Sequence, residues 1–142
     1  MEAKYPRVTV LHGVEHVTAL FFSDLAKIKQ VQALIWKQKR GYNTFGLGAI
    51  HAVHTIFKMQ ARLFNKGKDI GLLHASDTRM ARYFMAMHHD LRQRSALEST
   101  VGSAAFATLN LKPFAKKAAE EIKDKVMWKQ MYVLLQVLFS AL

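Results

Sequence analysis

The segment from His12 to His16, with the sequence HGVEH, has the residue types of a zinc peptidase motif. In that motif two histidines one helical turn apart hold one Zn²⁺, and the glutamate beside the metal is the general base for its water. A third ligand would have to come from a later helix, where Glu98, Glu120 and Glu121 are candidates. These residue types raise the hypothesis of a zinc hydrolase.

The sequence around this motif argues against a metal site. The segment PRVTVL (6–11) is rich in β-branched residues and opens with proline, which predicts a short strand, and helical periodicity begins only at Gly13. His12 would then precede the helix while His16 lies inside it, so the two imidazoles would not stack one turn apart. Glycine also weakens a helix interior by about 1 kcal/mol relative to alanine. The HxxEH hydrolase is therefore a remote alternative, and we expect no metal site.

The other histidines offer no clear catalytic set. His51 and His54 lie three positions apart on an expected helix, where they could share a metal or a phosphate, or could form the polar edge of an amphipathic helix. His88 and His89 point to different sides of their helix. Because no Ser-His-Asp set, glycine-rich phosphate loop or paired carboxylates stand out, we assign no catalytic residue and expect no cofactor.

Size and composition predict one globular domain. The chain has 142 residues, of which 51% are hydrophobic, and this is enough to bury a sizeable core. The absence of cysteine excludes disulfides and thiolate zinc sites. We find no signal peptide and no apolar run of about 20 residues, so we expect an intracellular chain that does not enter a membrane. The apolar ending, residues 131–142, is the basis for expecting a fragment of a longer protein.

The positive charge is concentrated in one part of the sequence. The net charge of +11 indicates an anionic partner, with nucleic acid favoured over a membrane surface. No acidic residue lies between Asp24 and Asp69, where nine lysines and arginines alternate with Trp36, Tyr42 and three phenylalanines. Cations for phosphates and aromatic rings for stacking are typical of nucleic-acid binding that follows the backbone. The alternative is that the cations form a solvated face and the aromatic rings belong to the core.

The spacing of apolar residues, together with capping residues, proline and glycine, predicts the elements that must position these residues. Apolar spacing predicts helices, with Asp77 and Asp124 as N-caps, Pro113 at a first helical position, and the segment GYNTFGLG (41–48) ending the second helix. The segment GSAAFATLN is expected to hold at most one or two short helical turns. The predicted fold is a single mainly helical domain, 1–142, with a short N-terminal strand and about six helices, at 13–29, 31–40, 50–64, 77–100, 113–122 and 126–142.

Three segments resemble the hAT (Ac-like) transposase superfamily in a degenerate or partial form. In this family a Cys/Asp-x-x-His motif opens a helix leading out of an RNase H-like core, and GVEH stands in its place here, with His16 matching. A Thr-Arg-Trp motif begins a helix in an inserted all-α domain, and here Thr78 and Arg79 match while Met80 replaces the tryptophan. Further on, the family has a Phe-Trp pair before an apolar helix, where Trp128 matches and Met127 does not.

The resemblance implies an RNase H-like transposase architecture, a nuclear location and DNA as partner. It also implies that His16 is a conformational or DNA-proximal residue, and that the intact family uses three acidic residues to bind two Mg²⁺ ions. None of Asp24, Asp77 or Asp90 matches those acids. The resemblance therefore implies a transposase-derived fragment that does not itself catalyse transposition.

Our leading hypothesis is a helical, transposase-derived DNA-binding module that lacks the catalytic acids. It would contact phosphates, mostly without sequence specificity. The alternative is a helical protein interaction or oligomerisation module, in which the apolar C-terminal segment pairs with a second copy or with the absent catalytic core. The predicted DNA-contacting residues are Lys37, Lys39, Arg40, Arg79, Arg82 and Arg92.

Overall fold

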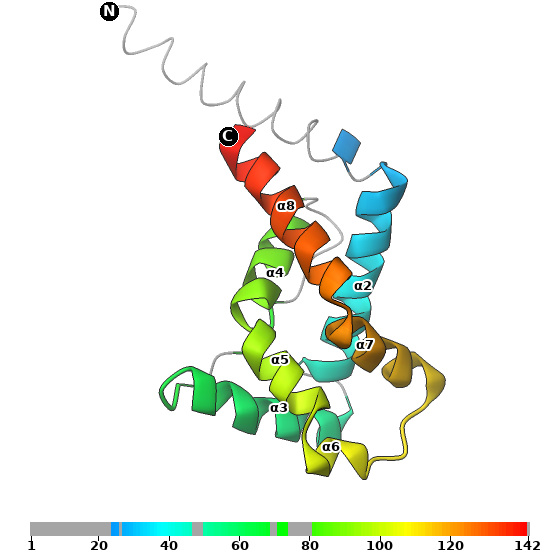
Figure 1. The fold of residues 1–142 in the computed structure, drawn as a ribbon, viewed down its shortest axis with the longest axis vertical. Coiled ribbons are helices and arrows are strands. Elements are labelled where there is room, and N and C mark those ends of the chain that lie inside the picture. The colour runs from blue at the N-terminus through cyan, green and yellow to red at the C-terminus, as the bar shows by residue number, and fades with distance from the viewer. Residues whose placement is uncertain (1–23, 26, 47–49, 69–70, 74–80, 142) are drawn as a thin grey trace, which may run out of the picture.

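The computed structural model describes residues 24–25, 27–46, 50–68, 71–73 and 81–141. Within these residues the chain forms seven α-helices and no strand (Figure 1). The helices are α2 (Lys29–Phe45), α3 (His51–Phe64), α4 (Ala81–Arg92), α5 (Arg94–Val101), α6 (Ala104–Ala107), α7 (Pro113–Lys123) and α8 (Lys125–Ala141). The mainly helical fold predicted from the sequence is confirmed.

Several predictions fall on residues that lie outside this description. They are the short strand at 6–11, the HGVEH segment, most of the predicted helix 13–29, the cap at Asp77 and the family-motif residues Thr78 and Arg79. An RNase H-like architecture stays a prediction.

Helix α2 is longer than the sequence predicts, because it continues through Gly41 to Phe45. Glycine in a helix interior costs about 1 kcal/mol relative to alanine. The added turn buries Phe45 completely, and the Phe45 ring stacks on that of Phe106 at 6.2 Å, which offsets this cost. The helix ends at Gly46, where a Cβ would lie 2.7 Å from the Tyr42 carbonyl oxygen. The glycine-rich segment thus ends the helix five residues later than expected.

The predicted long helix 77–100 is wrong as a single element, because α4 and α5 are separate helices that meet at Gln93. The backbone N–H of Gln93 donates to both the His89 and Asp90 carbonyls, a tightened turn that ends α4. The Gln93 side chain is buried and accepts a 3.1 Å hydrogen bond from Nδ2 of Asn65, at the end of α3. No proline or glycine marks this bend. The bend is accompanied by the tertiary contact between Gln93 and Asn65, which cannot be predicted from the local sequence.

Helices α7 and α8 begin where the sequence predicts. Pro113 occupies the first turn of α7, where its missing N–H is not needed. The Asp124 carboxylate accepts a 2.9 Å hydrogen bond from the Val126 N–H and so caps the start of α8. The predicted short turn in GSAAFATLN is α6, whose N-cap Ser103 accepts from the Phe106 N–H.

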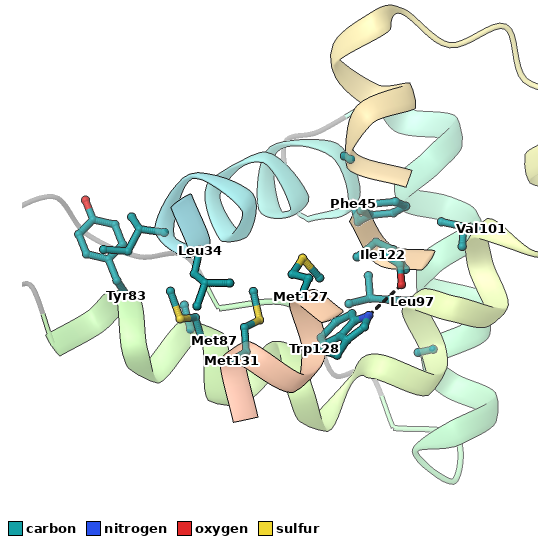
Figure 2. Packing of buried hydrophobic residues seen from close by; sticks show 14 of the residues in the cluster. Leu34, Phe45, Tyr83, Met87, Leu97, Val101, Ile122, Met127, Trp128 and Met131 are labelled. Carbon is teal, nitrogen blue, oxygen red and sulfur yellow. Dashed lines mark hydrogen bonds between the residues drawn. The ribbon is translucent and has the colours of Figure 1, made fainter. Parts of the chain in front are cut away.

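One cluster of buried side chains joins the helices (Figure 2). Trp128 belongs to this cluster, and its indole N–H donates a 2.8 Å hydrogen bond to the Ile122 carbonyl at the end of α7. Alanines on α7, including Ala118, are buried and allow the neighbouring helices to approach closely. In the described part of the chain, no helix combines the length and the apolar character needed to cross a membrane.

Candidate nucleic-acid interface

Cations from three helices line one open groove of about 560 Å³. Helices α4 and α8 pack side by side, and α5 follows directly on α4 (Figure 1). Residues three and four positions apart share a helix face, so each of the two long helices presents one stripe to the groove. The lining residues are His88, Leu91 and Arg92 from α4, Arg94 from α5, and Lys125, Trp128, Lys129 and Tyr132 from α8. We call this set the cationic groove.

The apolar base of the cationic groove is also part of the core. Trp128 is only 1% exposed, so its ring cannot stack with a ligand, and its indole N–H is already bonded to Ile122. The Arg94 guanidinium lies 5.4 Å from the centre of the Trp128 ring, at cation–π distance. Tyr132, in contrast, is exposed, and its hydroxyl accepts a 2.7 Å hydrogen bond from Gln136. Tyr132 is therefore the lining aromatic residue that can offer a ring to a partner.

The charge of the cationic groove is only partly neutralised. Nε of Arg94 lies 3.1 Å from Oε1 of Glu98 one turn further along α5, and both side chains are more than a third exposed. Exposed pairs of this kind contribute little energy and exchange readily with solvent. Lys125, Lys129 and Arg92 are exposed, and the lining residues include no acid. The cationic groove thus combines positive charge, one exposed aromatic ring and an open shape, which suits a phosphate-bearing chain.

The cations predicted on α2 lie elsewhere. One guanidinium nitrogen of Arg40 lies 2.6 Å from both carboxylate oxygens of Glu121, and the Arg40 guanidinium also lies 5.8 Å from the Phe114 ring. Nζ of Lys39 lies 5.3 Å from the Trp36 ring and 4.8 Å from the Tyr83 ring. These two cations therefore make intramolecular contacts between helices.

The other predicted DNA-contacting residues are spread out. Lys37 is half-buried and lines a small internal cavity, while Arg82 is exposed on α4. Arg92 is the member of the predicted set that lines the cationic groove, and Arg79 lies outside the described residues.

Sequence reasoning missed Arg94, Lys125 and Lys129. A signal for the lysines was present, because Lys125, Trp128, Lys129 and Tyr132 follow helical spacing directly after the Asp124 cap. What the sequence did not show is that this stripe packs beside α4, more than thirty residues earlier in the chain. Trp128, matched to the hAT family by the resemblance, lies at the base of the cationic groove.

Two of the acids nominated as a third metal ligand form ion pairs with arginines, while His12, Glu15 and His16 lie outside the described residues. Glu121 pairs with Arg40 and Glu98 pairs with Arg94. The described residues contain no group of three or more histidines and acids placed to hold a metal ion. The Nδ1 atom of His54 is 2.9 Å from the Phe45 carbonyl oxygen, so His54 joins α3 to the end of α2. This contact supports the structural alternative for His54, while His51 is exposed.

A buried polar pair lies between α2 and α4. The Asp90 carboxyl and the Gln38 amide are almost fully buried and line a cavity of about 10 Å³, with Lys37, Glu121 and Trp128. Among the residues that the structure describes, neither Oδ1 of Asp90 nor either polar side-chain atom of Gln38 has a hydrogen-bonding partner. Burial raises the pKa of Asp90 well above its usual value, and the nearby Gln38 amide offsets part of that rise. A buried carboxyl of this kind favours its neutral form.

Comparison with known proteins finds no matching family model, no matching curated protein and no matching solved structure.

Proposed function

We propose that this chain binds nucleic acid through the cationic groove, mostly without sequence specificity and without catalysis. The observation that carries the proposal is the convergence of Arg92, Arg94, Lys125 and Lys129 on one open groove beside the exposed Tyr132 ring. Lysines and arginines release counterions when they neutralise phosphates, and this release supplies most of the affinity in binding that does not read sequence. The net charge of +11 supports the same partner.

The resemblance to hAT transposases favours DNA as the nucleic acid and a nuclear location. In this proposal the chain is a transposase-derived module that lacks the acids for two-metal chemistry. The environments of several acids fit a chain without such a centre, because Glu98 and Glu121 pair with arginines and Asp124 caps α8. Asp90 is buried away from solvent.

The test is a fluorescence anisotropy titration with a random-sequence duplex at about 50 and 200 mM salt. The variant Lys125→Gln/Lys129→Gln should weaken binding and lower the slope of log affinity against log salt by about 2, close to one unit per lysine. The matched control is Lys116→Gln/Lys117→Gln, which removes two exposed lysines from α7 outside the cationic groove. Equal losses in both variants would show that binding is diffuse and would reject the cationic groove as the site.

Tyr132 separates single-stranded from duplex binding. Bases of a single strand are free to stack on an exposed ring, and each such stack is worth about 1–3 kcal/mol. Tyr132→Ala should therefore weaken binding of a single strand about fivefold or more, while Tyr132→Phe retains it. Adding Mg²⁺ should produce no strand cleavage. Cleavage that depends on Mg²⁺ would contradict a non-catalytic role.

A second candidate function is protein interaction through α8. Three exposed valines on this helix are spaced seven and four positions apart and therefore form one apolar stripe: Val126, Val133 and Val137. A stripe of this kind suits a second copy or a separate catalytic core as partner. Light scattering over a range of concentrations tests self-association, and a monodisperse monomer that does not change with Val133→Gln/Val137→Gln would count against it.

A further inference from the structure

The outer face of α3 exposes large apolar side chains. Its inner face, with Val53, Phe57 and Ala61, is completely buried, and α3 packs chiefly against α5. On the other side Met59 is 61% exposed and Leu63 is 76% exposed. Because these two residues are four positions apart, they lie next to each other along one edge of the helix. This edge faces away from the core.

Cations run beside this apolar edge. Lys58 and Arg62 are exposed, and each precedes one of the two apolar residues by a single position, so they form a parallel edge on the same outer face. Lys66 and Lys68, just beyond the helix, are also exposed. No acidic residue occurs in the sequence from 25 to 68. The outer face of α3 therefore carries apolar side chains along one edge and cations along the other.

A structured turn holds the end of this face in place. The Gly67 N–H donates a 2.8 Å hydrogen bond to the Arg62 carbonyl, while Lys66 and Gly67 adopt positive φ values of 55° and 82°. This pattern closes the helix with a Schellman turn. Phe64, at the end of α3, is 54% exposed. The turn fixes the direction in which the chain leaves α3, so Lys66 and Lys68 stay next to the end of this helix.

We infer that the outer face of α3 docks on an anionic lipid surface, with α3 lying in the plane of the headgroups. Met59 and Leu63 would enter the boundary between headgroups and acyl chains, while the exposed cations Lys66 and Lys68 contact lipid phosphates and carboxylates. Nucleic acid fits this face less well, because Met59 and Leu63 offer no stacking ring and would gain little beside a phosphate backbone. The cationic groove lies on other helices, so the two surfaces are separable.

The test is co-sedimentation of the full chain with vesicles. Vesicles of phosphatidylcholine containing about a third phosphatidylserine should bind the chain, and pure phosphatidylcholine vesicles should bind it much more weakly. Met59→Gln/Leu63→Gln should reduce binding to the anionic vesicles at least about tenfold, because it removes two inserting apolar groups. Lys66→Gln/Lys68→Gln should also reduce it, and this loss should shrink at high salt because charge screening weakens the contribution of the lysines.

The matched control is Met85→Gln, which replaces an exposed apolar residue on α4 and should bind the anionic vesicles as the unaltered chain does. DNA affinity should be unchanged in Met59→Gln/Leu63→Gln, which keeps this test independent of the proposed function. Failure to bind anionic vesicles, or equal binding by Met59→Gln/Leu63→Gln and Met85→Gln, would overturn the inference. A change of oligomeric state on Met59→Gln/Leu63→Gln without vesicle binding would instead assign the face to a protein partner.

Discussion

Two glutamate–arginine ion pairs in this molecule have the same chemistry but differ in exposure and in the helices that they connect. Arg40 pairs with Glu121 at 2.6 Å and lies beside Phe114, and Arg94 pairs with Glu98 at 3.1 Å and lies beside Trp128. The first pair joins α2 to α7 across 81 positions of sequence, and its side chains are 17% and 12% exposed. The second lies within α5, with side chains 36% and 41% exposed.

The difference lies in what each arginine is free to do. A cation that is shielded from solvent and joins two helices stabilises the fold, because breaking the pair leaves a charge without compensation. A cation in a local, exposed pair loses little when its partner changes. Arg94 can therefore turn to a phosphate in the cationic groove, whereas Arg40 is held by Glu121.

The largest expected effect is on stability. Glu121→Gln should lower the free energy of unfolding by on the order of 2 kcal/mol, because it leaves the Arg40 guanidinium without a countercharge. The matched variant Glu98→Gln should change it by no more than about 0.5 kcal/mol. Urea unfolding followed by circular dichroism measures both. Equal losses would remove the distinction between the two pairs.

The second prediction concerns how the free energy of unfolding depends on pH through Asp90. This residue lines the same cavity as Glu121 and Trp128. Since burial raises the pKa of Asp90, the folded chain keeps a proton that the unfolded chain has released. The contribution of this proton to the free energy of unfolding is fully present below the pKa of Asp90 in the unfolded chain, about 4. It is lost as the pH rises through the pKa of Asp90 in the folded chain. Asp90→Asn should not show this loss.

Unfolding titrations at a series of pH values check this prediction. The unfolding free energy of Asp90→Asn, relative to that of the unaltered chain, should increase from acid towards neutral pH. Parallel curves for the two proteins would show that Asp90 does not titrate differently on folding. Lys37 and Glu121 line the same cavity, so Glu121→Gln should be measured over the same pH range to separate its contribution.

The smallest expected effect is on DNA affinity and concerns the exposed pair of Arg94 and Glu98. Glu98→Gln removes a negative charge next to the cationic groove and releases Arg94, so DNA affinity should rise about twofold. Anisotropy titration at low salt is the measurement, because screening hides small charge effects at high salt. A fall in affinity would mean that Glu98 holds Arg94 in its binding position.

Local signals in the sequence predicted most elements but not all of their ends. Pro113 and Asp124 marked α7 and α8, and the apolar period marked the buried faces of α2 and α3. The end of α2 and the bend at Gln93 were missed. Phe45 is buried against Phe106, and Gln93 bonds Asn65, in both cases with a residue far along the chain. Local propensity carries no information about such partners.

The candidate site, too, could be predicted from the sequence only in part. Apolar periodicity was enough to predict a mainly helical chain, because it is a property of the sequence itself. Net charge led to the prediction of an anionic partner, which stays a prediction. Packing decided which cations are available, because it turned Arg40 towards Glu121 and brought Lys125 and Lys129 beside Arg92 and Arg94. A charge acts through its distance to other charges and to solvent, and those distances are set only when helices far apart in the sequence come together.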